Sequence, residues 1–457
     1  MGGGFDKLVD DIIIEVLCAL SVPDILSIRQ TSKRLSLLTR LRNIWHHKFC
    51  CEVLSCNLPI PGHVVPLPSI PASDLEWRTR RAMRLKNRWR TSGPDTITTF
   101  DLPVGDEDVH QVTVMAGGRQ VLTVHTNRIV LWRISGVVGR ALNVSRMGEY
   151  VFPLDEVCRV VRDPSSSDIV AVATERRPDS PVVILSTGPG AIFTQLCYYP
   201  VVQGVVVGLY DHLLLSSVSP SSEAVGGVEV RDWRSGGRGS ILFPEEPGLF
   251  GRFLDFQFFN SHILLVWEEC LSVYALPNIP SSGQLIADPV KIYRFAEPLT
   301  HPVSFTTCKP RLLPDVQPPS ESTSSSRSLT IVARPRYRPS GLVHTLLRPL
   351  PVEDDPFPFG LIRIPQRGND QICTASCLGP SGRGVWVGNN TVHRCSPVAL
   401  MVPFCEMQLT VDLAMNIPVC TIEKEVSARP YCIDFDDGMG RLVVGSEHGK
   451  VSIIDLV

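Results

Sequence analysis

A strand–turn–strand pattern recurs through most of the chain, and it restricts the possible folds more than any other feature. In each copy a nearly all-apolar segment precedes a short polar turn and a segment of alternating apolar and polar residues. The first segment is typical of a strand buried on both faces, and the second of a strand with one solvated face. The copies are GRQVLTVHTNRIVLWRI from Gly118, SHILLVWEECLSVYAL from Ser261, GRLVVGSEHGKVSIIDL from Gly440, and weaker ones from Tyr210 and Gly382.

Another apolar strand is expected before each hairpin, which makes every unit a sheet of three or four strands. Seven such strands are predicted to begin near Val109, Val157, Phe193, Phe253, Val303, Ile372 and Tyr431, at a mean spacing of about 54 residues. Repeated small antiparallel sheets favour a seven-bladed β-propeller, in which the sheets close into a ring. An array of two-sheet sandwiches is the alternative.

The ends of the repeat region bear on whether the ring closes. The last unit has only three predicted strands before Val457, whereas the segment TITTFDL, residues 96–102, is a strand without a unit of its own. We expect this strand to complete the last sheet by pairing with its outer strand, because that joins the two ends of the repeat region by backbone hydrogen bonds.

The first 45 residues follow a helical period instead. Leu8, Ile12, Val16 and Leu20 recur at steps of four, and Ile13 and Leu17 widen this apolar stripe. Ser21 is predicted to cap a second helix, and a third helical pattern runs from Leu35 to Trp45. Three short helices cannot bury this apolar surface by themselves. They therefore pack either as a cap on the β region or against a partner.

Individual residues in this stretch make the match more specific. It resembles an F-box, the module of roughly 45 residues that docks on the Skp adaptor of cullin–RING ubiquitin ligases. The matching positions are Leu8, Asp10, Asp11, Ile12, Ile13, Val16, Leu20, Pro23, Asp24, Leu26, Ser32, Lys33, Arg34, Leu38 and Trp45, in register without a gap. The one departure is Val9, where the pattern has proline. The resemblance implies that the adaptor binds Leu8, Ile12, Ile13, Val16, Leu20, Pro23, Leu26, Leu38 and Trp45.

A proline-rich connector and a basic helix follow. Residues 57–73 contain five prolines, which predicts a stiff, extended segment. Ser73 and Glu76 are expected to form a capping box at the start of the next helix. Seven Lys and Arg residues lie between 78 and 90, whereas Leu75, Ala82, Leu85 and Trp89 share one stripe. A basic helix of this kind could bind RNA or acidic lipid, but we favour a linker helix whose stripe packs under the β region and whose charges face water.

The β region itself resembles a WD-repeat propeller, in a degenerate form. Repeat length and hairpin shape carry this resemblance, because no Trp-Asp dipeptide is present: Trp132 precedes Arg and Trp267 precedes Glu. The order of F-box, proline-rich connector, basic helix and degenerate propeller resembles a group of fungal F-box proteins.

Catalytic and metal-binding motifs are missing from the sequence. It contains no phosphate-binding G-x-x-x-x-G-K-[ST] loop, no G-x-G-x-x-G after a strand, no H-E-x-x-H and no G-x-S-x-G. None of the fourteen cysteines stands in a C-x-x-C pair. We therefore expect no catalytic residue, no metal and no cofactor. Unpaired thiols, a beginning unlike a signal peptide and the lack of a long apolar run indicate a cytoplasmic or nuclear location, without a membrane.

The sequence therefore predicts a multi-domain protein with a small all-α F-box head and an all-β propeller. The expected boundaries are 1–56 for the F-box, 57–72 for the connector, 73–91 for the basic linker helix and 95–457 for the propeller. The resemblance implies the substrate-recognition subunit of an SCF-type cullin–RING ubiquitin ligase, with the Skp-type adaptor and through it a cullin on the head and an unknown target protein on the propeller. Nucleic acid is not an expected partner. A non-ligase F-box scaffold and a propeller enzyme are the alternatives.

Overall fold

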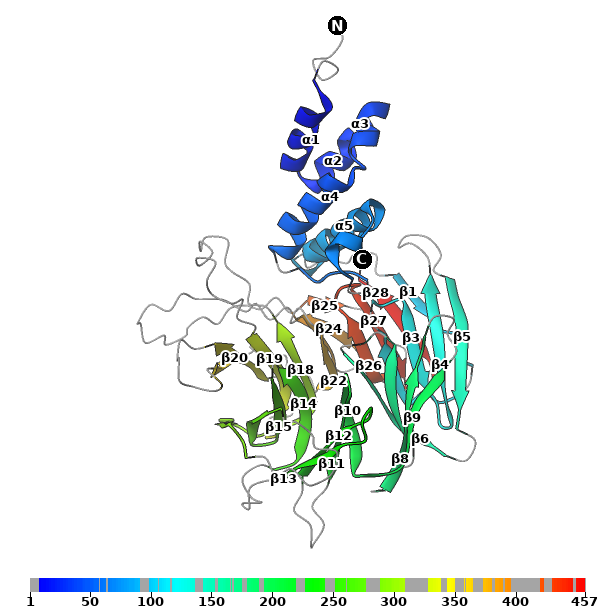
Figure 1. Cartoon of the computed structure of the whole chain (residues 1–457), viewed down its shortest axis with the longest axis vertical. Helices are drawn as coiled ribbons and strands as arrows, with labels where there is room; N and C mark the ends of the chain where they lie inside the picture. Colours follow the sequence, from blue (N-terminus) through cyan, green and yellow to red (C-terminus); the bar gives the residue numbers. More distant parts are fainter. Residues whose placement is uncertain are drawn as a thin grey trace, which may run out of the picture.

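A computed structural model gives a short helical N-terminal region followed by a mostly β domain (Figure 1). It describes residues 8–56, 58–62, 65–90, 98–105, 107–115, 117–135, 143–152, 155–164, 166, 168–174, 179–188, 193–218, 227–242, 251–259, 261–276, 288–308, 328–337, 343–349, 357, 359–364, 373–379, 383–388, 391–395, 420–422, 430–446 and 449–456. None of the helices in these segments has the length and hydrophobicity that crossing a bilayer requires. The Asn389–Asn390 turn expected between two strands lies outside the described residues.

The helical region begins with four short helices and ends with a long one. The elements are α1 (Asp10–Ala19), α2 (Val22–Ile28), α3 (Lys33–Leu38), α4 (Arg42–Lys48), the π-helical turn η2 (Phe49–Leu54), the 3-10 helix η3 (Leu67–Ser69) and α5 (Ala72–Arg90). The predicted cap of α2 is present, since the Ser21 side chain accepts a hydrogen bond from the Asp24 N–H. We call α1 to α4 together with η2 the helical head.

The single helical pattern predicted from Leu35 to Trp45 is wrong, because the structure divides it into α3 and α4. Thr39 lies between the two helices and is fully buried. Its carbonyl oxygen accepts hydrogen bonds from Trp45 Nε1 at 2.7 Å and from Arg29 Nη2 at 3.0 Å. These side chains hold the turn that ends α3, and the chain changes direction there.

The helical head has one core, which extends beyond its own helices. Besides residues of α1 to α4, the core contains Leu58 and Ile70 of the connector and Leu75 and Ala82 of α5. The connector lies along the head, and Arg42 donates hydrogen bonds to its carbonyl groups, including that of Ile70 at 3.2 Å. The connector is therefore a packed part of the helical region and also contains η3, although the sequence predicted an extended segment.

The capping box predicted at Ser73 and Glu76 is also wrong. α5 starts one residue before Ser73, and the carbonyl oxygen of Pro71 accepts the Leu75 N–H at 3.0 Å. Glu76 is thus inside the helix, where its carboxylate forms an ion pair with Arg29 at 2.7 Å. Pro71, just before the helix, has a fixed φ that suits a helix start. Glu76 is therefore not needed as a cap, and its side chain contacts Arg29.

The β domain consists of seven antiparallel sheets of four strands each among the described residues. In chain order of their first strands they are β2 (Gln111–Val114), β3 (Gln120–Val124), β4 (Arg128–Ser135), β5 (Asn143–Val151); β6 (Val157–Arg162), β7 (Ile169–Thr174), β8 (Asp179–Ser186), β9 (Thr194–Gln203); β10 (Val205–Tyr210), β11 (Leu213–Val218), β12 (Gly227–Asp232), β13 (Arg238–Leu242); β14 (Phe253–Phe259), β15 (His262–Trp267), β16 (Cys270–Ala275), β17 (Lys291–Arg294); β18 (Leu299–Cys308), β19 (Ser328–Pro335), β20 (Val343–Pro349), β21 (Phe359–Ile364); β22 (Cys373–Leu378), β23 (Gly384–Gly388), β24 (Thr391–Cys395), β25 (Cys420–Ile422); and β26 (Pro430–Asp436), β27 (Arg441–Ser446), β28 (Val451–Asp455), β1 (Thr98–Asp101).

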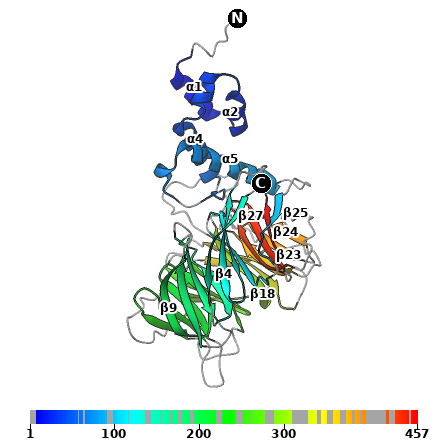
Figure 2. The ribbon, with the colours of Figure 1, turned by 90° about the vertical axis from the view of Figure 1, so that its right-hand side faces the viewer.

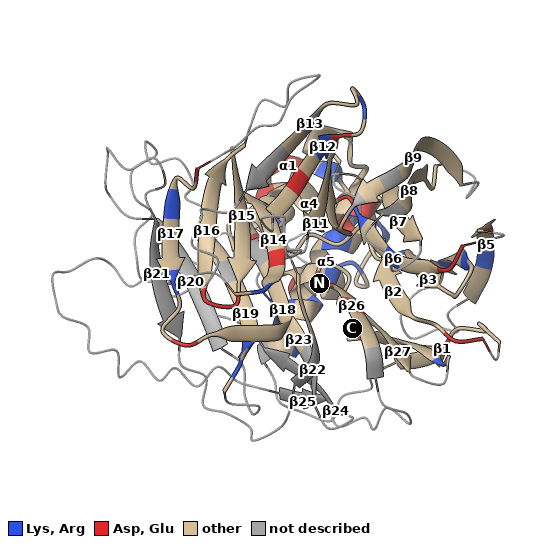
Figure 3. Cartoon of the chain, turned by 90° about the horizontal axis from the view of Figure 1, so that it is seen from below, with Lys and Arg blue, Asp and Glu red and all other residues tan. Residues whose placement is uncertain are grey.

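The first strand of each sheet contacts the first strand of the next, from β2 to β26, and β26 also contacts β2. Seen from the end away from the helical head, the strands of the sheets follow one another outward from the middle of the domain (Figure 3). Polar side chains join these first strands: Asp434 accepts the Val114 N–H at 2.7 Å, and Gln111 accepts the Val160 N–H at 3.0 Å. Seven neighbouring sheets thus share the middle of the domain.

The pairing predicted for the segment 96–102 is confirmed. Its described part, β1, pairs antiparallel with β28, and Phe100 lies opposite Ile453. Asp101 adds a side-chain hydrogen bond from the Ser452 hydroxyl at 2.6 Å. A strand from before the first sheet therefore completes the last one.

One of the seven predicted strand starts is wrong. The strand near Phe193 is β9, the fourth strand of the second sheet, and the first strand of the third sheet is β10. Gly204, at a φ of +81°, separates the two strands inside the single apolar run that the sequence presents. Tyr198 and Leu196 of β9 are exposed, so an apolar composition did not distinguish an outer strand from an inner one here.

Candidate protein-binding surface

Helix α1 carries apolar side chains on two faces, and only one of them is buried. Ile13 and Leu17 are each 1% exposed and belong to the core of the head. Leu8, just before the helix, and Ile12 and Val16 within it are 37%, 50% and 37% exposed. The predicted stripe at steps of four is therefore the exposed face, and the residues that were expected only to widen it face the core.

Two further leucines from the α3 region are exposed on the head. Leu37, in α3, is 72% exposed, and Leu41 follows this helix. Arg34 ties the two helices together, because its Nε donates to Asp10 Oδ1 at 2.9 Å at the start of α1. Figures 1 and 2 place α1 at the end of the molecule away from the β domain. Apolar side chains thus face solvent where no other described part of the chain covers them.

We call Leu8, Ile12 and Val16 the apolar face of α1. Of the other predicted adaptor-binding residues, Pro23 is exposed in the first turn of α2, and Leu20 and Leu26 are half-buried against the core. Ile13, Leu38 and Trp45 are buried inside the head. In the chain by itself these three residues hold the head together, so a docking partner could reach the remaining six directly.

Trp45 is the centre of the contact between the head and α5. It is fully buried, and the Arg29 guanidinium lies 5.8 Å from its ring centroid. The same guanidinium binds both carboxylate oxygens of Glu76 in α5, at 2.7 and 2.9 Å. A bidentate ion pair in a partly buried place is geometrically specific, so α5 has a fixed orientation on the head. The sequence indicated Glu76 only as part of a capping box, and Arg29 did not stand out in it.

The apolar stripe of α5 is buried as predicted, but it belongs to two different cores. Leu75 and Ala82 pack with the head, whereas Leu85 and Trp89 pack against residues of the sixth and seventh sheets, among them Phe435. The ring centroids of Trp89 and Phe435 are 6.1 Å apart in an edge-on arrangement. One helix therefore packs on the head at one end and on the β domain at the other (Figure 2).

The prediction that the charges of α5 face water is wrong for two of its arginines. Arg78 is buried and pairs with Asp74 one turn earlier, at 2.9 Å. Arg81 is buried under the β domain and donates from Nε to the Met439 carbonyl oxygen at 3.0 Å. Arg84 is exposed, as expected. Burial of Arg81 follows from the docking of α5, since its neighbours Leu85 and Trp89 bring that side of the helix against the last sheet.

A metal ion or a nucleophilic reaction would need suitable side chains in the described segments. Within them, no group of three or more His, Cys, Asp or Glu side chains is arranged to hold a metal ion. Burial raises the pKa of the Cys377 thiol well above its usual value, and the nearby Asp434 carboxylate adds to this rise. A thiol that stays protonated is a poor nucleophile and a poor metal ligand.

Comparison with known proteins adds no assignment. No family model matches the chain, and a search of curated proteins found no match. The apolar face of α1 is therefore interpreted from its own geometry and from the sequence resemblance.

Proposed function

We propose that the helical head docks on a Skp-type adaptor of a cullin–RING ubiquitin ligase and that the β domain binds the target protein. The apolar face of α1 is the observation that carries this proposal. Three apolar side chains on one face, with Leu37 and Leu41 nearby, are unusual on a surface that meets only water. The face coincides with positions that the F-box resemblance assigns to the adaptor, and it lies at the far end from the β domain.

We propose further that the β domain is a closed seven-bladed β-propeller, each sheet being one blade. The contacts between successive first strands and the contact of β26 with β2 support a ring. The pairing of β1 with β28 supports closure by the two ends of the region, which leaves fewer open strand edges. Such a ring presents loops on two faces, and these are where a target protein would bind.

In this role the chain makes and breaks no covalent bond. It holds the target near the ubiquitin-loaded enzyme, which raises the effective concentration and restricts the orientation of the two. α5 serves this purpose because it belongs to the core of the head at one end and contacts the last sheet at the other. The connector, which the sequence suggested as the spacer, lies along the head and leaves that task to the helix.

Two aspartates on the apolar face of α1 test the proposal. Ile12→Asp with Val16→Asp should leave the fold intact, since both side chains are exposed in the free chain. In a complex each carboxylate would be buried without a partner, at several kcal/mol each, so affinity for the purified adaptor should fall by at least about 100-fold. The measurement is adaptor affinity by calorimetry, together with the melting temperature of each variant.

The matched control introduces the same charges elsewhere. Val151→Asp and Val205→Asp replace valines of similar exposure in the β domain, and adaptor binding should be unchanged. Equal adaptor binding by the Ile12, Val16 variant and the wild-type chain would refute the docking assignment. Co-purification of a cullin with the wild-type chain separates a ligase subunit from a scaffold that binds the adaptor alone.

A further inference from the structure

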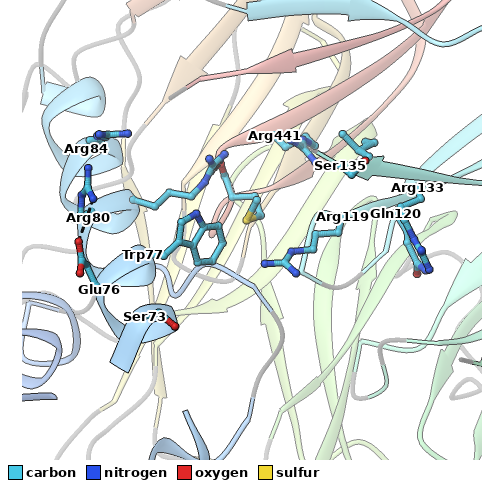
Figure 4. Close-up of a pocket in the computed structure, with 13 residues that line it drawn as sticks. Ser73, Glu76, Trp77, Arg80, Arg84, Arg119, Gln120, Arg133, Ser135 and Arg441 are labelled. Carbon is cyan, nitrogen blue, oxygen red and sulfur yellow. Dashed lines mark hydrogen bonds and ion pairs between the residues drawn. The ribbon is translucent and has the colours of Figure 1, made fainter. Parts of the chain in front are cut away.

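A cavity of about 920 Å³ lies between α5 and the edge of the β domain. Its walls come from three separate parts of the chain: the outer side of α5, the β3–β4 hairpin of the first sheet, and the start of β27 in the last sheet. Figure 4 shows the α5 residues on one side and Arg119, Gln120 and Arg133 on the other, with Trp77 between them. This volume is in the range of small-molecule sites, which is about 300–1,000 Å³.

The lining of this cavity is strongly positive. It contains six arginines and only one carboxylate, that of Glu76. The six are Arg80, Arg81 and Arg84 of α5, Arg119 and Arg133 of the first sheet, and Arg441 of the last. Glu76 is already shared between Arg29 and Arg80, at 2.7 and 3.1 Å. One carboxylate therefore does little to balance the arginines that face the cavity.

The arginines of the lining fall into two groups. Arg441 forms a buried, bidentate pair with Asp455, with both N···O distances at 2.7 Å, and Arg81 donates to the Met439 carbonyl. Arg80 pairs with Glu76 at 3.1 Å, so these three have protein partners. Arg84, Arg119 and Arg133, by contrast, form no ion pair with any carboxylate in the described segments, and all three are exposed. The second group is free to bind an anion.

The positive charges of the arginines that line the cavity repel one another. Burial is the main reason that the pKa of Arg81 is lowered to about 10; within that result the charges of Asp455 and Asp436 raise the pKa, and those of Arg441 and Arg84 lower it. Burial and then the charge of Arg80 lower the pKa of Arg84. Cations that repel one another in a partly desolvated place gain most from a multivalent anion.

Trp77 gives the cavity a flat apolar wall. The Arg119 guanidinium lies 5.4 Å from the Trp77 ring centroid, within the range of a cation–π contact. This contact holds the guanidinium beside the opening of the cavity, so less freedom is lost when it binds a ligand. A planar guanidinium can donate two parallel hydrogen bonds to a phosphate group, which an ammonium group cannot do.

We propose that this cavity binds a small polyanion that carries two or more phosphate groups. Three unpaired arginines on two opposite walls match several phosphates at once better than a single one. A hollow of about 920 Å³ fits a small molecule better than a nucleic acid strand, which needs a continuous groove along its backbone. Because the ligand would bridge α5, the first sheet and the last sheet, it would also hold the helical head on the β domain. The proposal does not depend on the F-box assignment.

Tripolyphosphate is the probe, and the full chain is the protein to use. It should bind with a Kd in the micromolar range and raise the melting temperature by several degrees, since it binds only the folded state. ATP should bind similarly, whereas orthophosphate should bind at least about tenfold more weakly because it reaches fewer arginines. Equal affinity for orthophosphate and tripolyphosphate, or the absence of binding by tripolyphosphate and ATP alike, would overturn the proposal.

Charge-matched variants locate the binding. Arg84→Gln with Arg119→Gln removes two unpaired cavity arginines and should lower the affinity for tripolyphosphate by at least about tenfold. Arg40→Gln with Arg294→Gln removes two exposed arginines outside the cavity and should leave the affinity within about twofold. A similar loss in both double variants would mean binding by net charge alone and would sink the site. If the chain binds a phosphorylated peptide but neither tripolyphosphate nor ATP, the cavity is a peptide-binding site and the proposal is wrong.

Discussion

The helical head and the β domain treat their apolar residues differently. In the β domain the second strand of a sheet can be almost wholly buried: every residue of β27 and all but the first of β15 are buried. In the head, α1 leaves Ile12 and Val16 exposed, although Ile13 and Leu17 of the same helix are buried in the core. The difference indicates that the exposed face of α1 is not a shortage of core. It is surface that a further molecule can bury.

The two regions nevertheless do not form separate modules. Leu75 and Ala82 of α5 complete the core of the head, and Leu85, three residues after Ala82, is fully buried against the last sheet. The head therefore depends on a helix that the β domain also holds. A partner docked on α1 would have a defined orientation relative to the β domain, which a proline-rich spacer alone would not provide.

The largest expected effect comes from cutting the chain between head and helix. A fragment of residues 1–56 loses Leu58, Ile70, Leu75 and Ala82 from its core. Burial of a Leu or Ile side chain contributes about 1.5–3 kcal/mol, and the sum exceeds the stability of so small a domain. We expect dispersed amide NMR resonances for residues 1–90 and a collapsed, narrow spectrum for 1–56. A well-dispersed spectrum for the shorter fragment would mean that the head is an independent module.

An intermediate effect is expected at the contact between α5 and the last sheet. Gly440 has a φ of +63°, and a Cβ there would lie 2.2 Å from Leu85 Cδ2. Gly440→Ala should lower the free energy of unfolding by about 2–3 kcal/mol and separate the melting of the head from that of the β domain. Calorimetry detects both changes.

Gly236→Ala is the matched control for this substitution. Gly236 also has a positive φ, +77°, but apart from its two chain neighbours no described residue has an atom within 4 Å of the position of its Cβ. Only backbone strain should remain, at about 1 kcal/mol, with a single transition. If both alanine variants lose the same stability, the contact of Gly440 with Leu85 contributes little and the two regions are joined elsewhere.

The smallest effect concerns the turn that receives α5. Burial raises the pKa of Asp436 from its ordinary value of 3.8 to about 6, and its Oδ1 accepts the Met439 N–H at 2.7 Å. The folded state holds the proton of the Asp436 carboxyl more tightly than the unfolded state does, so protonation of Asp436 stabilises the fold. This contribution to the free energy of unfolding is complete below about pH 4 and is lost as the pH rises through 6.

Asp436→Asn keeps the acceptor oxygen and removes the charge. It should therefore raise the free energy of unfolding by about 1 kcal/mol at pH 7.5 and leave it unchanged near pH 4. Denaturant unfolding at the two pH values checks this. A gain of the same size at both pH values would show that the charge of Asp436 is not the cause.

Local patterns in the sequence were sufficient for much of this architecture. Strand hairpins and the buried stripe of α5 followed from residue periodicity, because period two and period 3.6 are properties of neighbouring residues. The pairing of the 96–102 segment followed from the missing strand of the last unit. Periodicity was not sufficient where one apolar run serves two elements. The run around Gly204 divides into β9 and β10 of different sheets, and the pattern from Leu35 to Trp45 divides at Thr39.

The sequence by itself determined which residues are apolar, how they are spaced and which secondary structure most of the strongly periodic segments adopt. Only the tertiary structure decided which face of α1 turns inward, since Ile12 and Ile13 are equally apolar and the choice depends on what α4 and α5 offer opposite them. The same holds for the arginine-lined cavity. Its charges come from residues more than 300 positions apart, such as Arg81 and Arg441, and no local pattern encodes their meeting. Packing of distant segments fixes both, because burial and electrostatic repulsion depend on distance in space and not along the chain.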